Sequence, residues 1–269
     1  MNIEWIKLSS EIEIPMVGLG TYDLKEEEIQ NGIRSGYRMF DTASQYENEE
    51  EVGRAIKRSG VSRREIIIST KLWTEDIRRH NVRQAALDSL KRLDTDYIDI
   101  FLIHWPAEGY TEAWLEMEKL LREGLVRSIG VCNCNRRHLE ALQSMSEIKP
   151  VINQIESHPV FSNDDLIQYC KEIKVQTEAW CPLGGSYAKL TQKKELVDIA
   201  GKYGVSVAQL ILRWHLQRGV IVIPRSSRAE HQRSNLDLFG FDIRDEDMLL
   251  ISNLNTNKRL GADPDNFNF

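Results

Sequence analysis

Residues 41–49 read Asp-Thr-Ala-Ser-Gln-Tyr-Glu-Asn-Glu, and this stretch decides the fold. A short apolar run, Tyr37-Arg38-Met39-Phe40, precedes it and predicts a buried strand that ends at Asp41. Tyr46 follows on the connecting loop, and the residues after Asn48 carry apolar side chains at helical spacing. The stretch therefore predicts a strand, a loop and a helix, with a carboxylate at the strand tip and a phenol on the loop.

Two later apolar runs end in the same way, one leading to Lys71 and the other to His104. The three strand tips are separated by roughly 30 residues each, about one strand-plus-helix unit. Because the ends of successive parallel strands meet at one side of a sheet, we expect a cluster there. Its members are Asp41, Tyr46, Lys71 and His104.

The rest of the chain alternates between strand and helix patterns. The strand candidates are short and rich in Val and Ile, as is typical of strands buried on both faces. They are Met16–Leu19, Tyr37–Asp41, Ile66–Thr70, Tyr97–His104, Val126–Cys132, Val151–Ile155, Val175–Trp180 and Val220–Ile223. Between them lie helical patterns, one of which opens with a capping box, Ser206-Val-Ala-Gln209, and closes at Gly219.

Eight strand-helix units favour a closed barrel over an open sheet. We therefore predict an α/β fold, a (β/α)8 TIM barrel, preceded by a β-hairpin within Trp5–Pro15. Residues 261–269 have no helical pattern and are expected to form a tail. No linker-like or low-complexity stretch interrupts the pattern, so we expect residues 1–269 to form one domain.

Composition narrows the function classes. The net charge is −6, from 35 basic and 41 acidic residues, which gives no general attraction to nucleic acid or to an anionic membrane. The first 15 residues lack a signal-type apolar core, and the most apolar run, Tyr97–Pro106, is too short to span a bilayer. The four cysteines do not resemble a disulfide framework. We expect a monomeric cytoplasmic protein.

The predicted cluster suggests a chemistry. Asp41 would pair with Lys71 and keep it charged, and Lys71 would then lower the pKa of Tyr46 from its usual value of about 10. A phenol tuned in this way can act as a general acid near neutral pH. His104 can donate a hydrogen bond to a carbonyl oxygen. Such a site suits carbonyl reduction but contains no hydride, so a cofactor is required.

The chain resembles the aldo-keto reductases over nearly its whole length, and its short loops are similar to the small microbial members of the 2,5-diketogluconate and methylglyoxal reductase type. The matching stretches are Gly18–Thr21, Asp41–Glu49, Lys71–Trp73, Leu102–Pro106, Gly130–Asn133, Asn153–Pro159, Pro182–Gly184 and Ile223–Ser226. The resemblance implies a barrel that reduces small aldehydes or ketones to alcohols, with Tyr46 as general acid. It implies NADPH (NADP+) as the cofactor and NADH as a weaker alternative.

The resemblance also implies positions for the cofactor. They are Gly20, Thr21, Asp41, Cys132, Asn133, Gln154, Trp180, Pro182, Leu183, Gly184, Ile223, Pro224, Arg225, Ser226, His231 and Asn235. Asn133 and Gln154 would hold the nicotinamide carboxamide, and Trp180 would stack in place of the family's usual tyrosine. Four further departures are Cys132 for serine, Arg225 for lysine, His231 for arginine and Ser234 for glutamate. The implied substrate positions are Tyr22, Tyr46, Trp73, His104 and Trp105.

Two other function classes compete with this interpretation. Some aldo-keto reductase relatives are channel-associated subunits that bind the cofactor and sense redox state, and such a non-enzymatic barrel is one alternative. A metal-dependent barrel hydrolase would require a His-x-His pair near the first strand, and residues 17–22 offer none. We therefore expect no metal site.

Overall fold

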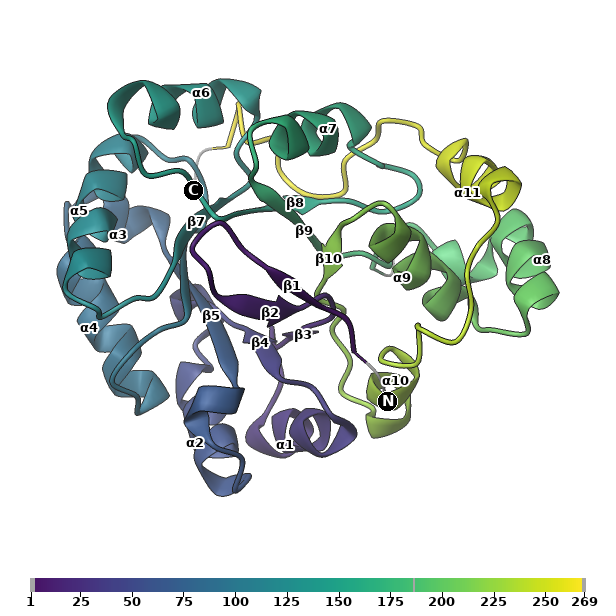
Figure 1. Ribbon diagram of the computed structural model, residues 1–269, viewed down its shortest axis with the longest axis horizontal. Helices are drawn as coiled ribbons and strands as arrows, with labels where there is room; N and C mark the ends of the chain where they lie inside the picture. Colours follow the sequence, from purple (N-terminus) through teal and green to yellow (C-terminus); the bar gives the residue numbers. More distant parts are fainter. Residues whose placement is uncertain (1–2, 186, 268–269) are drawn as a thin grey trace.

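The computed structural model describes residues 3–185 and 187–267, and its centre is a sheet of eight parallel strands (Figure 1). Neighbouring strands in the sheet are also neighbours in the sequence. The strands are β3 (Leu19–Gly20), β4 (Met39–Asp41), β5 (Ile67–Leu72), β6 (Ile100–Ile103), β7 (Ile129–Cys132), β8 (Ile152–Glu156), β9 (Gln176–Trp180) and β10 (Ile221–Val222). Every residue of β5, β6, β7 and β8 is buried, as expected for strands covered on both faces.

The first and last strands of the sheet meet and close it. Val17 forms a parallel bridge with Val222, whose N–H donates to the Met16 carbonyl over 3.0 Å and whose carbonyl accepts from Gly18 N–H over 2.9 Å. Close approach continues at Gly20, where a Cβ atom would lie 2.8 Å from the backbone oxygen of Ile223. The predicted (β/α)8 barrel is confirmed.

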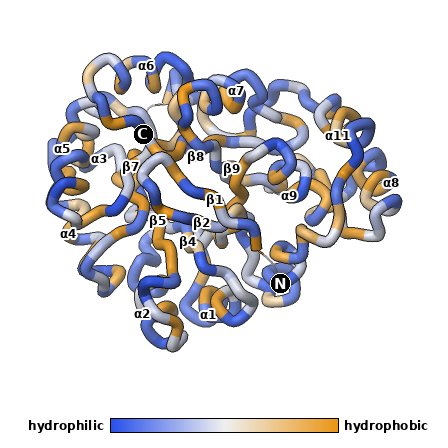
Figure 2. The backbone as a smooth tube through the Cα atoms, in the orientation of Figure 1, coloured by the Kyte–Doolittle hydropathy of each residue, from blue (hydrophilic) through white to orange (hydrophobic). Residues whose placement is uncertain are grey.

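Helices surround the strands (Figure 1). They are α1 (Glu26–Ser35), α2 (Glu49–Arg58), α3 (Thr74–Arg78), α4 (Val82–Leu93), α5 (Tyr110–Arg122), α6 (Arg136–Met145), α7 (Asp164–Glu172), α8 (Lys194–Tyr203), α9 (Val207–Gln217), α10 (Ala229–Ser234) and α11 (Asp245–Ser252). Three short 3-10 turns are η1 (Ser44–Tyr46), η2 (Arg63–Glu65) and η3 (Leu190–Gln192). Figure 2 shows that the central strands are largely apolar, whereas hydrophilic residues recur along the surrounding helices. In the described parts of the chain, no helix combines the length and apolarity needed to cross a bilayer.

Helix α9 begins and ends where the sequence predicts. The Ser206 hydroxyl accepts from the Gln209 N–H over 3.2 Å, and the Gln209 side chain accepts from the Ser206 N–H over 3.1 Å. This capping box satisfies two N–H groups that have no partner inside the helix. Gly219, with φ of 75°, takes the left-handed conformation just after the helix and so ends it.

The predicted hairpin is also present, formed by β1 (Trp5–Lys7) and β2 (Glu13–Pro15) in antiparallel register. It lies across the centre of the barrel in Figure 1. Its turn contacts the start of β7, because the hydroxyls of Ser10 and Ser128 are 2.6 Å apart. The hairpin therefore covers the end of the barrel where the strands begin.

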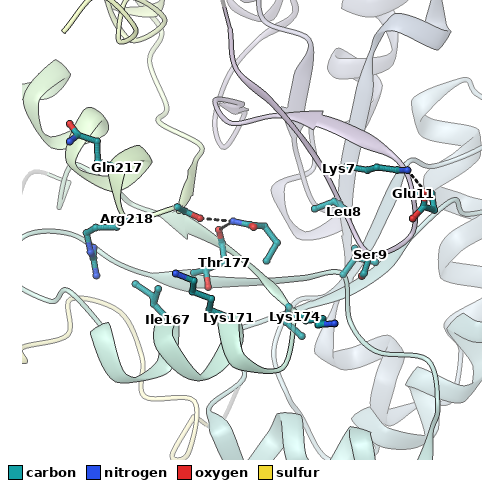
Figure 3. A pocket seen from close by; sticks show the side chains of 14 residues that line it. Lys7, Leu8, Ser9, Glu11, Ile167, Lys171, Lys174, Thr177, Gln217 and Arg218 are labelled. Carbon is teal, nitrogen blue, oxygen red and sulfur yellow. Dashed lines mark hydrogen bonds and ion pairs between the residues drawn. The ribbon is translucent and has the colours of Figure 1, made fainter. Parts of the chain in front are cut away.

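Beside the hairpin lies a hollow of about 660 Å³, lined in part by Lys7, Lys171, Lys174 and Arg218 (Figure 3). Its cations are partly neutralised, since Lys7 pairs with Glu11 and Arg218 with Asp164. At the other end of the chain, residues 261–267 form neither helix nor strand, as predicted for the tail. Residues 268 and 269 of that prediction lie outside the described residues.

The packing of α2 on α4 gives a test of the fold. In α2, a Cβ atom at Gly53 would lie 2.7 Å from the backbone carbonyl carbon of Leu93, so Gly53→Ala should lower the free energy of unfolding by about 1–3 kcal/mol. Gly201 is a matched control inside α8, because a Cβ there meets nothing within 4 Å. Gly201→Ala should raise the free energy of unfolding by roughly 0.5–1 kcal/mol. Urea denaturation followed by circular dichroism measures both, and equal effects of the two substitutions would contradict the packing.

Candidate active site

Four polar side chains meet where the strands end. β4 ends at Asp41, Lys71 lies near the end of β5, His104 directly follows β6, and Tyr46 ends the turn η1. Asp41 and Lys71 are buried, while Tyr46 and His104 are partly exposed. The structure thus brings together the four residues predicted from their spacing.

The loop that carries Tyr46 is held in place by Asn48 and Glu49, where the loop joins helix α2. Asn48 accepts a hydrogen bond of 2.9 Å from the Thr42 hydroxyl and donates one of 2.6 Å to the Thr21 carbonyl. Glu49 is buried, and it accepts from the Thr70 hydroxyl over 2.5 Å and pairs with Arg92. Since these contacts tie the loop to three neighbouring segments, the phenol is positioned by the scaffold rather than by a free loop.

Lys71 is fully buried and uses its ammonium group completely. Its Nζ donates to Oδ1 of Asp41 over 2.6 Å, to the Thr42 carbonyl over 2.8 Å and to the Tyr46 hydroxyl over 3.5 Å. Burial alone would lower the pKa of Lys71, but the negative charge of Asp41 and the neighbouring Tyr46 offset it and raise the pKa. The lysine therefore keeps its positive charge, as predicted from the Asp41–Lys71 pairing.

The predicted lowering of the Tyr46 pKa is wrong in its net direction. Burial raises the pKa of Tyr46 to about 12, and this effect exceeds the opposite effect of the Lys71 charge. Asp41 adds a smaller contribution that also raises it. The phenol is therefore protonated at neutral pH, with a cation beside it that stabilises the phenolate whenever the proton leaves.

His104 is electrically neutral in this setting. Burial, and secondarily the charge of Lys71, hold the pKa of His104 well below its usual range. Its ring packs edge-on against Tyr46 and Trp73, with ring centroids 5.8 and 5.1 Å away. A neutral imidazole next to a protonated phenol places two hydrogen-bond donors side by side.

A cavity of about 600 Å³ opens above these residues. Its lining includes most of the predicted cofactor positions and two residues that the sequence did not single out, Cys181 and Gly185. The walls are formed by Gly20, Thr21, Tyr22, Asp41, Tyr46, His104, Trp105, Asn133, Gln154, Trp180, Cys181, Pro182, Leu183, Gly185, Ile223, Pro224 and Arg225. Among the predicted residues, Lys71 and Cys132 are fully buried, and the lining does not include Trp73, Gly184, Ser226, His231 or Asn235.

Asn133 and Trp180 form one side of the cavity. The indole N–H of Trp180 donates to Oδ1 of Asn133 over 2.8 Å, and Nδ2 of Asn133 donates to the His104 carbonyl over 3.0 Å. Asn133 adopts the left-handed conformation, with φ of 58°, directly after β7. This conformation turns the chain at the strand end and directs the amide to its two partners.

Gln154 forms another part of the wall, and it reveals a residue that sequence reasoning missed. Its Nε2 donates to Oδ2 of Asp41 over 2.9 Å and to Oε1 of Glu178 over 2.6 Å. Glu178 is 1% exposed and lies in the middle of β9. A carboxyl group inside a strand expected to be buried was the signal that could have identified it.

The loop after β9 turns sharply beside the cavity. Cys181, Gly184 and Gly185 all have positive φ, of 52°, 70° and 55°. Gly184 packs tightly, since a Cβ there would lie 2.6 Å from Ala188. The loop therefore presents backbone to the cavity around Pro182 and Leu183.

Arg225, one of the implied cofactor positions, already has partners within the protein. The Arg225 guanidinium donates to the carbonyls of Tyr22 and Asp23, over 3.0 and 3.1 Å, and pairs with the Asp23 carboxylate at 3.3 Å. It therefore links the segment after β10 to the loop after β3. Ser226 and Asn235 are buried, whereas His231 is exposed on α10.

Aromatic rings surround the approach to His104. Tyr22 packs edge-on against Tyr46 at 5.1 Å between centroids, and Trp105 packs against Phe267 at 5.1 Å. Trp73 contacts His104 but faces a neighbouring acidic hollow rather than the main cavity wall. Of the aromatic residues at the implied substrate positions, Tyr22 and Trp105 thus line the cavity, and Trp73 packs against His104 from the side.

The C-terminal segment packs against the same end of the barrel. The Glu156 carboxylate, at the end of β8, accepts from the backbone N–H groups of Leu260 and Gly261 over 2.6 and 3.1 Å. A Cβ at Gly261 would lie 2.5 Å from the Trp180 ring, so only glycine fits there. Within residues 3–185 and 187–267, no group of three or more His, Cys, Asp or Glu side chains is arranged to hold a metal ion.

Comparison with known proteins places this site in context. Residues 21–256 match the Aldo/keto reductase family. The chain is 44% identical to methylglyoxal reductase DkgA of Escherichia coli O157:H7, with 97% of each chain covered. It is 43% identical to glyoxal reductase of Bacillus subtilis (strain 168), over 98% of this chain and 97% of that protein. A Bombyx mori aldo-keto reductase solved in complex with NADP superposes with a TM-score of 0.92, at 34% identity, over 98% of this chain and 97% of the other.

The neutral state of His104 can be tested directly. Because burial and the Lys71 charge lower its pKa, the imidazole should show no titration between about pH 5.5 and 8. Two-dimensional 1H–15N NMR of the histidine rings measures this, with His104→Gln assigning the resonance. A titration midpoint near the ordinary value of about 6.5 would show that the site does not hold His104 neutral.

Proposed function

The chain belongs to the aldo/keto reductase family, and from that premise we propose that it reduces aldehydes or ketones to alcohols with NADPH, using Tyr46 as the general acid. It is an oxidoreductase that acts on carbonyl groups. The observation that carries the proposal is a protonated phenol 3.5 Å from a buried ammonium, at the edge of a cavity of about 600 Å³.

The proposed proton transfer follows from this contact. Reduction of a carbonyl places negative charge on its oxygen, and Tyr46 donates its proton there. A phenol with a pKa of about 12 is too weak an acid to donate its proton readily by itself. Lys71 reduces the barrier because its charge stabilises the phenolate as it forms, and Asp41 keeps Lys71 in place through their 2.6 Å contact.

His104 is proposed to orient the carbonyl. Its ring is neutral, so it can donate one hydrogen bond to the carbonyl oxygen without competing for the proton. Lys71 supports this role by opposing protonation of the imidazole. Both donors line the same cavity, and the rings of Tyr46 and His104 lie 5.8 Å apart in an edge-on arrangement, close enough to contact one small carbonyl group.

The cavity fits the nicotinamide end of the cofactor. When bound, the nicotinamide supplies the hydride that reduces the carbonyl carbon. Gln154 offers an amide oxygen that accepts no hydrogen bond from the described residues, and Asn133 offers an amide nitrogen, which match the donor and acceptor of a carboxamide. The indole of Trp180, fixed by its bond to Asn133, offers a flat face for the ring.

The remaining cofactor positions are proposed for the phosphates and the adenosine. Gly20, Thr21 and the backbone of Pro182, Leu183 and Gly184 would follow the pyrophosphate, and Cys132 would lie behind the nicotinamide site. The adenosine and its phosphate would contact the segment after β10 and helix α10. The residues concerned are Ile223, Pro224, Arg225, Ser226, His231 and Asn235.

For the substrate we propose small dicarbonyl compounds. Two relatives are named as reductases of methylglyoxal and of glyoxal. A cavity shared with a nicotinamide ring and lined by Tyr22 and Trp105 leaves room for a short, weakly polar molecule. Tyr46 and His104 would contact its carbonyl oxygen, and Trp73 would support His104. We further propose one barrel domain that acts as a monomer in a reducing cytoplasm, where its four cysteines stay free.

Tyr46→Phe tests the general acid. It should lower kcat by at least about a hundredfold, because general acid catalysis by one side chain contributes about that much. NADPH binding should change little, and its dissociation constant can be measured by fluorescence quenching. Tyr203→Phe is the control, since that hydroxyl bonds Asp247 on the outer helices. A Tyr46→Phe enzyme with near-normal kcat would remove Tyr46 from the reaction.

Substitutions at His231 test the cofactor choice. NADPH carries a phosphate that NADH lacks, and a guanidinium binds phosphate better than an imidazole, which carries less charge at neutral pH. His231→Arg should therefore widen the preference for NADPH, and His231→Gln should narrow it. The dissociation constants of both cofactors measure the preference for each variant. Tighter binding of NADH than NADPH by the unmodified protein would show that Arg225, Ser226 and His231 do not hold the phosphate that distinguishes the two cofactors.

A further inference from the structure

One buried carboxyl group in the barrel has no role in the proton transfer described above. Glu178 is 1% exposed, and its Cα is paired in register with that of Gln154 on the neighbouring strand. The Nε2 atom of Gln154 donates to Oε1 of Glu178 over 2.6 Å and to Oδ2 of Asp41 over 2.9 Å. Gln154 therefore bridges two carboxyl groups with one nitrogen.

This bridge selects one of the two orientations of the Gln154 amide. An amide nitrogen carries two N–H donors, whereas the amide oxygen can only accept. If the amide flipped, its oxygen would lie against the Asp41 carboxylate, which can only accept, and both hydrogen bonds donated by Nε2 would be lost. The observed orientation leaves the amide oxygen of Gln154 available at the cavity wall.

We propose that Glu178 is a positioning residue for the cofactor, which together with Asp41 locks the Gln154 amide so that its oxygen faces the nicotinamide carboxamide. This inference rests on the proposed function, because it assigns Glu178 a part in binding the same cofactor. Glu178 does not touch the reacting atoms and acts through Gln154. Asp41 alone would leave one of the two N–H groups of Gln154 without this partner.

The charge of the site is compatible with this role. Burial, and then the charge of Asp41, raise the pKa of Glu178 to about 8, while the bond from Gln154 and the charge of Lys71 oppose the shift. Glu178 is therefore mostly protonated at neutral pH. Its Oε2 has no partner among the described residues, so a proton on Oε2 leaves Oε1 able to accept from Gln154.

Protonation of Glu178 also protects the neighbouring ion pair. The titratable groups around it are Asp41 from β4, Lys71 from β5 and Cys132 from β7. A second carboxylate beside Asp41 would compete for the single cation, Lys71. As a neutral acid, Glu178 holds Gln154 without disturbing that pair.

The test compares two ligands of the full-length protein. NADP+ contains the nicotinamide, and 2′,5′-ADP contains only the adenosine end with its phosphates. Glu178→Leu removes the accepting oxygen and should raise the dissociation constant of NADP+ about tenfold, as expected for one lost hydrogen bond to a buried group. The dissociation constant of 2′,5′-ADP should stay unchanged. Isothermal titration calorimetry measures both without requiring turnover.

Two further variants make the result specific. Glu178→Gln keeps an oxygen that can accept from Gln154, so it should restore NADP+ affinity to within about twofold of the unmodified protein. Glu118→Leu removes another buried carboxylate, which bonds Arg122 and Ser146 at the outer helices, and should leave both ligands unaffected. If Glu178→Leu does not fold, Glu178→Met carries the same expectation, since its unbranched chain lacks an oxygen.

The outcomes separate this inference from the proposed function. Unchanged NADP+ affinity in the Leu or Met variant, or equal weakening of both ligands, would overturn the role of Glu178 while the proposed function stands. Failure of the unmodified protein to bind NADP+ would instead overturn the proposed function. A selective loss of NADP+ affinity that Glu178→Gln reverses supports the positioning role.

Discussion

The ion pair between Lys71 and Asp41 is the interaction on which the rest of the site depends. Both groups are buried, and a buried charge without a partner is strongly destabilising. The parallel register pairs Asp41 with Ser69, two residues before Lys71, so the Asp41 and Lys71 side chains lie on the same face of the sheet and can meet. The pair also places a positive charge beside Tyr46 and His104, whose pKa values are set first by burial and second by that charge.

Asp41 connects two parts of the site because its two carboxylate oxygens have different partners. Oδ1 accepts from Lys71 and Oδ2 accepts from Gln154, so one carboxylate joins the proton-transfer side of the cavity to the cofactor side. The Lys71 charge in turn lowers the pKa of both Tyr46 and His104. It favours loss of a proton from the phenol and opposes gain of one by the imidazole. Burial is the larger influence and acts oppositely on the two rings, so the phenol keeps its proton while the imidazole stays neutral.

The strand tips at Asp41, Lys71 and His104 could be predicted because a regular strand-helix spacing brings them to one end of the barrel. The direction of the Tyr46 pKa shift could not be predicted, since it depends on how far the folded chain around the phenol shields it from water. The ion pair between Arg225 and Asp23 could not be predicted either, because residues so far apart in the chain meet only when the barrel closes. Glu178 gave a signal, a carboxyl group within a buried strand, but its partner depends on the register between β8 and β9.

The hairpin at the start of the chain has a practical consequence. It covers the end of the barrel where the strands begin, through the contact of Ser10 with Ser128, while the cavity opens at the opposite end. A surface attachment or fusion partner joined ahead of β1 would therefore leave the mouth of the cavity facing the solution. The C-terminal segment packs beside Trp180 and Trp105, so the same attachment there would crowd the entrance. Immobilising the protein through the segment ahead of β1 should therefore leave the cavity more accessible than immobilising it through the C-terminal segment.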